Sequence, residues 1–172
     1  WSFSKDGSLM LIQSQRDRIW RHSNTGTYYL LDIEKRSLTK VSEQNDMLRN
    51  VKISPDNRWV SYVRTDNNLY AFNIKRKREK KLTRTGSETI LNGHYGWVYE
   101  EELSGFDGYR WSPNSKHIAY VQEDQSQVGR FSMVDELQLY PKVEEVFYPK
   151  AGSTNPRIRV AVINVQGGGK KF

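Results

Sequence analysis

A repeated turn constrains the fold of this 172-residue chain more than any other feature of its sequence. Each copy has a strand that ends in Ser, a turn rich in Asp, Asn or Gly, and a second apolar strand. The copies occupy residues 3–12, 53–62 and 111–120. Because Asp, Asn and Gly form local side-chain hydrogen bonds and tolerate positive φ, each copy predicts a β-hairpin.

A second hairpin follows each copy. Apolar strands run into polar turns within residues 28–41 and 69–83, and residues 160–165 begin a third such pattern. Each repeat is thus two hairpins, or four short antiparallel strands, which is typical of β-propeller blades. We therefore predict an all-β fold in which residues 1–172 form a partial β-propeller domain. It would have about three four-stranded antiparallel blades.

These blades are expected to start near residues 3, 53 and 111 and to leave the ring open, because closure takes at least four blades. The chain also begins with Trp1 and no initiator Met, so we expect it to be a piece of a longer protein.

Insertions into the repeats are where function is expected, because the scaffold does not need them. Residues 13–26 separate the two hairpins of the first repeat, and residues 86–109 are expected to lie between the second and third blades. Residues 122–156 form the longest insertion, which we interpret as an arm.

Residues 97–103, with the sequence WVYEEEL, place three consecutive carboxylates in a chain of net charge +7. We predict a short helix here, anchored by Trp97, Val98 and Leu103. Adjacent helical residues point about 100° apart, so the three carboxylates diverge, although two can converge on one small cation. An ammonium group suits such a pair because it brings three hydrogen-bond donors. A solvated acidic turn is the alternative that composition leaves open.

The other polar clusters do not predict chemistry. The basic run at residues 75–81 lacks interleaved aromatic residues, so we interpret it as a solvated hairpin tip and expect no nucleic-acid partner. The histidines His22, His94 and His117 show no ligand spacing, and there is no cysteine, so neither a metal nor a cofactor is predicted. No nucleophile elbow or catalytic triad is recognisable, so no catalytic residue is predicted in this chain.

Residues 92–102, NGHYGWVYEEE, resemble the N-G-x-x-D-W-V-Y-E-E-E signature of the dipeptidyl peptidase IV family, which are serine exopeptidases of the prolyl oligopeptidase clan. The resemblance extends over nearly the whole chain, through residues 20–23 (WRHS), 109–113 (YRWSP), 139–142 (LYPK) and 148–156 (YPKAGSTNP). One departure is Gly96, where the family usually has Asp. If that Asp caps the helix, Gly is a tolerable replacement, at a cost of a few tenths of a kcal/mol.

The resemblance implies that the chain is a fragment of the N-terminal propeller of a serine dipeptidyl aminopeptidase, expected to be bacterial. The parent would release N-terminal Xaa-Pro or Xaa-Ala dipeptides. Glu101 and Glu102 would bind the free α-amino group of the peptide, and Arg21 the carbonyl of its penultimate residue. A missing C-terminal α/β-hydrolase domain would hold the catalytic triad, so the fragment should be inactive alone. Residues 134–156 of the arm would help to form a homodimer.

Two alternative functions remain, a prolyl tripeptidyl peptidase propeller and a non-catalytic propeller that binds proteins. For the parent, a periplasmic, secreted or membrane-anchored location is favoured.

Overall fold

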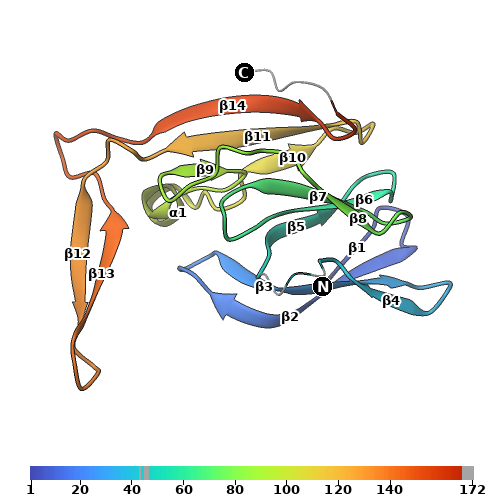
Figure 1. The fold of residues 1–172 in the computed structure, drawn as a ribbon, viewed down its shortest axis with the longest axis horizontal. Coiled ribbons are helices and arrows are strands. Elements are labelled where there is room, and N and C mark those ends of the chain that lie inside the picture. The colour runs from blue at the N-terminus through green and yellow to red at the C-terminus, as the bar shows by residue number, and fades with distance from the viewer. Residues whose placement is uncertain (43, 45–46, 168–172) are drawn as a thin grey trace.

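Three antiparallel sheets, one short helix and a protruding hairpin make up the part of the chain that the structure, a computed structural model, describes, namely residues 1–42, 44 and 47–167 (Figure 1). The first sheet has the order β1-β2-β3-β4 and consists of β1 (Ser2–Phe3), β2 (Leu9–Arg18), β3 (Asn24–Asp32) and β4 (Ser37–Lys40). The second has the order β5-β6-β7-β8 and consists of β5 (Arg49–Ile53), β6 (Trp59–Val63), β7 (Leu69–Asn73) and β8 (Arg78–Lys81).

The third sheet has the order β10-β11-β14, and a further short strand, β9, also pairs with β11. These strands are β9 (Ile90–Asn92), β10 (Tyr109–Trp111), β11 (His117–Asp124) and β14 (Arg157–Asn164). The helix is α1 (Trp97–Leu103), and the hairpin consists of β12 (Arg130–Asp135) and β13 (Lys142–Phe147).

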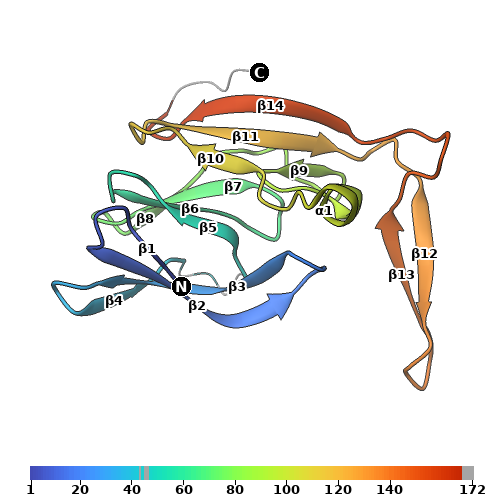
Figure 2. The ribbon, with the colours of Figure 1, turned by 180° about the vertical axis from the view of Figure 1, so that it is seen from behind.

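The sheets stack in chain order, as successive blades do, and within the described residues none of them closes on itself (Figures 1 and 2). One buried apolar cluster, which includes Leu30, Val60 and Tyr70, joins the first sheet to the second. Another, which includes Val63 and Ile118, joins the second to the third. The second sheet thus packs between the other two, and the prediction of an all-β, incomplete propeller is confirmed.

The repeated turn has the same hydrogen bonds in all three blades. The Ser hydroxyl donates to the side-chain oxygen two residues on, at 2.7–2.8 Å, and accepts the N–H five residues on, at 2.9–3.0 Å, for Ser4, Ser54 and Ser112. The residue three positions after the Ser has a positive φ, which is 74° at Gly7, 57° at Asn57 and 58° at Ser115. The hairpin prediction is therefore confirmed, with the local chemistry that the repeat indicated.

Helix α1 lies in the chain between β9 and β10, which both pair with β11, so it belongs to the third sheet. This corrects the expectation that residues 86–109 lie between blades. Leu91 of β9 pairs with Glu123, and Tyr109 of β10 pairs with Tyr120, so both strands run along β11. The segment between β9 and β10, which contains α1, is closed at its base, where the Gly108 N–H donates to the Gly93 carbonyl at 3.2 Å. Because the strands before and after α1 both pair with β11, the helix is held at both ends.

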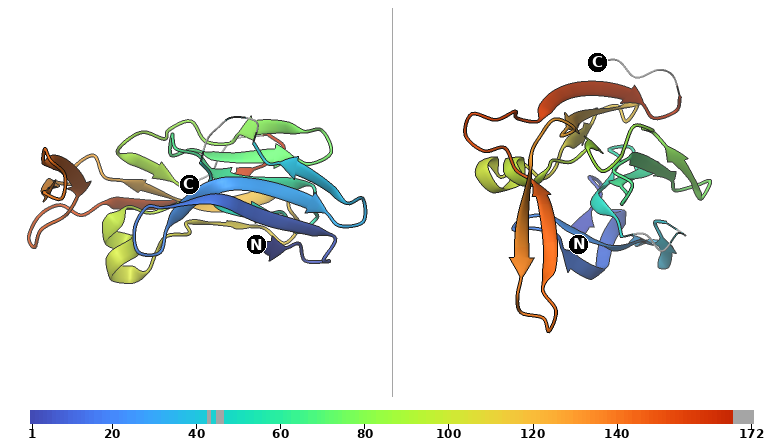
Figure 3. Two further views of the ribbon diagram at one scale, coloured as in Figure 1. Left: turned by 90° about the horizontal axis from the view of Figure 1, so that it is seen from below. Right: turned by 60° about the vertical axis from the view of Figure 1, so that its left-hand side comes forward.

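The long insertion begins as regular sheet, because β11 continues to Asp124 and pairs there with Arg157 of β14. Beyond it, β12 and β13 form a two-stranded hairpin that projects away from the stacked sheets (Figures 1–3). Within the described residues, no helix has the length and apolar character needed to cross a membrane.

Candidate functional site

Helix α1 has the bounds that the sequence predicts, but it is anchored differently. Trp97 packs against Tyr148, with ring centroids 5.2 Å apart, and Tyr99 packs against Tyr95 at 5.6 Å. Leu103 is 69% exposed, so the expectation that it anchors the helix is wrong. It stands in the last turn, where the chain leaves the helix toward solvent.

The strongest anchor of α1 is a carboxylate, that of Glu100, which is fully buried. One of its oxygens accepts the backbone N–H groups of His22 and Ser23, both at 2.7 Å. These two residues lie in the turn between β2 and β3. Glu100 therefore joins the helix to the hairpin tip that carries Arg21, a contact that the sequence did not predict. The spacing of three residues from Trp97, which places both on one helical face, was the only signal for it.

A buried Arg49 supplies positive charge near Glu100. Its Nη1 donates to His94 Nδ1 at 2.9 Å, and His94 Nε2 lies 2.9 Å from Asn67 Oδ1. Burial lowers the pKa of Arg49 to about 10, and the charge of Glu100 opposes that shift. Burial and Arg49 hold the pKa of His94 well below its usual value. At neutral pH Arg49 is thus charged and His94 neutral. Arg49 and Glu100 act on each other through their charges and not through a direct hydrogen bond, because Oε2 of Glu100 and the Nε and Nη2 of Arg49 are buried without a hydrogen-bond partner.

The Arg21 guanidinium reaches the second carboxylate of the helix, with Nε 2.6 Å from Oε1 of Glu101. The Arg21 side chain is 65% exposed and that of Glu101 is 21% exposed, so the pair lies at the surface. Beside it, His22 stacks on Phe106 with centroids 6.0 Å apart. Glu102 is exposed on the next helical position. The structure therefore brings Arg21 and Glu101 together and leaves Glu102, the next residue of the helix, exposed to solvent.

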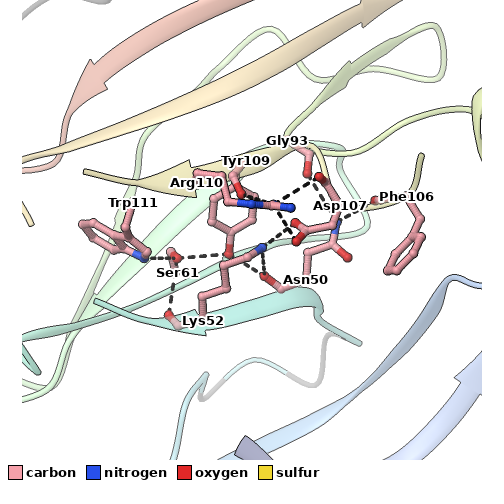
Figure 4. A network of polar contacts seen from close by, with 9 residues as sticks. All are labelled: Asn50, Lys52, Ser61, Gly93, Phe106, Asp107, Tyr109, Arg110 and Trp111. Carbon is pink, nitrogen blue, oxygen red and sulfur yellow. Dashed lines mark hydrogen bonds and ion pairs between the residues drawn. The ribbon is translucent and has the colours of Figure 1, made fainter. Parts of the chain in front are cut away.

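A polar network fixes the segment that returns from α1 to the sheet (Figure 4). Lys52 on β5 forms an ion pair with Asp107, and Arg110 reaches the same carboxylate at 2.6 Å. Asn50 donates to the Phe106 carbonyl at 2.9 Å. Burial lowers the pKa of Lys52, and Asp107 opposes this shift. The second blade thus supports the end of the helical excursion, as β11 supports its beginning.

Two exposed or half-buried carboxylates beside one guanidinium can bind a small cation together with a neutral acceptor. Arg21 balances only one of the two charges, so one carboxylate is left for a cationic ligand. Among the residues that the structure describes, no group of three His, Asp or Glu side chains is placed to hold a metal ion.

The basic run at residues 75–81 lies at the turn between β7 and β8 and on β8, as the hairpin-tip interpretation predicts. This turn is at the end of the sheets opposite α1 (Figure 1).

The chain matches the family model described as "Dipeptidyl peptidase IV (DPP IV) N-terminal region" over residues 4–171. It is 33% identical over 171 residues to dipeptidyl aminopeptidase B of Saccharomyces cerevisiae, and 34% identical over 168 residues to dipeptidyl peptidase 4 of Felis catus. These alignments cover 96% and 95% of this chain but 20% and 22% of the relatives, so the chain spans about a fifth of their length. Its fold is similar to the crystal structure of Porphyromonas gingivalis dipeptidyl peptidase 4, with a TM-score of 0.92 and 31% identity, over 99% of this chain and 24% of that one.

Proposed function

The chain belongs to the dipeptidyl peptidase IV family as its N-terminal region, and from this membership we propose that it recognises the free N-terminus of a peptide substrate. Glu101 and Glu102 bind the α-ammonium group, and Arg21 binds the carbonyl of the penultimate residue. The observation that carries the proposal is the 2.6 Å contact between Arg21 and Glu101 beside an exposed Glu102. An ammonium group can complete this arrangement because it offers the donors and the charge that the second carboxylate lacks.

Recognition of this kind supports a dipeptidyl register. Carboxylates that bind the α-ammonium group of the substrate exclude a peptide that continues beyond that position, because an amide nitrogen brings no charge. Their fixed distance from a nucleophile then measures off a set number of residues, and that positioning converts binding energy into rate. We propose that the nucleophile belongs to a serine hydrolase domain outside this chain, and that the parent releases Xaa-Pro or Xaa-Ala dipeptides. Residues 1–172 form its partial propeller, with blades starting near 3, 53 and 111 and the arm at 122–156.

The proposal predicts that the full-length parent depends on the substrate's amine. An Ala-Pro amide and a propionyl-Pro amide differ only in that amine. We expect kcat/KM to be higher for the Ala-Pro compound by about 10²-fold or more, since removing one partner of a desolvated charge pair costs 2–5 kcal/mol. Steady-state hydrolysis of both compounds measures this amine ratio, defined as kcat/KM for Ala-Pro divided by kcat/KM for propionyl-Pro. Equal rates would remove the proposed role of the Glu pair.

A second proposal concerns the arm, whose residues 134–156 we assign to a homodimer interface of the parent. Its hairpin exposes large apolar side chains, among them Val134 (55% exposed), Leu137 (97%), Leu139 (91%), Tyr140 (81%) and Val143 (59%). Such a group of exposed apolar side chains marks an interaction site in a soluble protein.

Leu139→Glu in the parent is expected to weaken self-association by at least about tenfold, because a charge would be buried in the interface. Sedimentation equilibrium of the purified parent and of the variant measures the dissociation constant of self-association. The matched control is Glu136→Gln, which alters charge on the same hairpin without burying a new one. A parent that is monomeric before any substitution would contradict the assignment.

A further inference from the structure

Helix α1 starts without a capping side chain. Its N-cap residue is Gly96, with φ −78° and ψ 179°, and the N-cap makes no side-chain hydrogen bond to the first turn. The first N–H groups of any helix lack intrahelical partners, so they need acceptors from elsewhere. For one of these groups, the N–H of the N-cap residue itself, the acceptor comes from β11. Glu123 is fully buried, and its Oε2 accepts the Gly96 N–H at 2.9 Å.

Glu123 and Gln125 occupy the space that a capping side chain would use. Glu123 Oε1 accepts a hydrogen bond from Gln125 Nε2 at 2.7 Å. A Cβ atom built on Gly96 would lie 1.9 Å from that Nε2 and 2.8 Å from the Oε1. The glycine and the buried pair therefore fit together, and neither position can change alone without disturbing the other.

Burial disfavours the charged form of the Glu123 carboxylate. Burial raises the pKa of Glu123, while the bonds from Gly96 and Gln125 lower it. Glu123, on β11, also pairs with Leu91 of β9, the strand that leads into the helix. Glu123 thus contacts β9 through the strand pairing of its backbone and the start of α1 through its side chain.

We propose that Glu123 is a positioning residue for the amine-binding carboxylates, acting in place of a helix cap. The inference rests on the proposed function of Glu101 and Glu102. A helix of seven residues is too short to be stable by itself, so its contacts with the surrounding chain, at Glu100 and at its N-terminus, decide where its side chains point. Glu101 and Glu102 follow Gly96 by five and six residues, which is about 8–9 Å along a helix axis. A shift at the N-terminus is therefore passed directly to both.

The test uses Glu123→Ala in the full-length parent and the amine ratio. We expect kcat/KM on the Ala-Pro amide to fall by about 10- to 100-fold, because a misplacement of 1 Å can cost about 10². The propionyl-Pro amide does not use the carboxylates, so its kcat/KM should stay within about threefold and the ratio should collapse. An equal fall on both substrates would mean general structural damage and would overturn the inference.

A rescue variant strengthens the test. Asp is a preferred N-cap residue, and Glu123→Ala frees the Gln125 amide to move aside. We therefore expect Gly96→Asp to lower the amine ratio by itself but to restore it to within about threefold when it is combined with Glu123→Ala. Failure of the double variant to recover any of the ratio would contradict the capping role. If Glu123→Ala does not fold, Glu123→Met replaces it. Met fills a similar volume but offers the Gly96 N–H no oxygen, so an unchanged ratio would count against the inference.

The positioning role of Glu123 and the amine-binding role of Glu101 and Glu102 can be refuted separately. If Glu101→Ala and Glu102→Ala, measured in parallel, collapse the ratio while Glu123→Ala leaves it unchanged, the positioning role is wrong and the proposed function stands. If the Glu101 and Glu102 variants also keep the ratio, the proposed function itself is wrong.

Discussion

Glu101→Ala and Glu102→Ala in the full-length parent are each expected to lower kcat/KM on free-amine Xaa-Pro substrates by about 10²- to 10³-fold, the cost of breaking one partner of a hydrogen-bonded charge pair. The two changes should differ in kind. Glu101 also holds Arg21 at 2.6 Å, so its loss frees the guanidinium that would meet the substrate carbonyl. Glu102 is exposed and has no such second duty in the proposal.

A double-mutant cycle separates the two carboxylates. Arg21→Ala combined with Glu101→Ala should cost less than the sum of the single changes, because each removes the same ion pair. Arg21→Ala combined with Glu102→Ala should be closer to additive. Glu34→Ala is the matched control, since it removes an exposed carboxylate at the turn after β3 and should leave kcat/KM unaltered. Retention of normal kcat/KM by both Glu variants would refute the assignment of this helix.

The propeller could be predicted from the sequence because its signals are local. The turn after Ser54 carries its own hydrogen bonds, to Asp56 and to the Trp59 N–H, within five residues of chain. The bounds of α1 are local as well, since the segment begins after a glycine and ends at Ser104 in the left-handed region. Signals of this range are visible in a single sequence and repeat wherever the turn repeats.

The site could be predicted only in part, because its contacts cross the chain. Arg21 and Glu101 are 80 residues apart, and the resemblance of two short segments to a family suggested their partnership, whereas no periodicity did. Glu100 and Glu123 were missed. Their partners lie 77 and 27 residues away, and a carboxylate in an exposed-looking acidic run gives no sign that it is buried. The place of α1 within β9 and β10 was also missed, because strands of three residues are too short to show alternation.

Glu100→Ala is expected to be the most damaging single change to the architecture of the site. It removes the acceptor of two N–H groups, those of His22 and Ser23, and it leaves the buried Arg49 without the charge that opposes its desolvation. Loss of one member of a buried charged group destabilises by about 3–5 kcal/mol. The tip that carries Arg21 would then separate from the helix that carries Glu101. Differential scanning calorimetry of the parent should show a lower Tm, and kcat/KM on the Ala-Pro amide should fall with it.

Two further variants test whether charge or hydrogen bonding dominates at Glu100. Glu100→Gln keeps an oxygen for the His22 and Ser23 N–H groups but removes the charge, so it isolates the effect on Arg49. Adding Arg49→Met to Glu100→Gln also removes the buried cation, and replacing two opposite buried charges by uncharged side chains is often neutral. If the charge pair dominates, the double variant should regain most of the Tm that Glu100→Gln loses. If Glu100→Gln alone behaves as wild type, the backbone bonds to the hairpin tip carry the anchor, and Arg49 belongs to the packing around His94 rather than to the amine site.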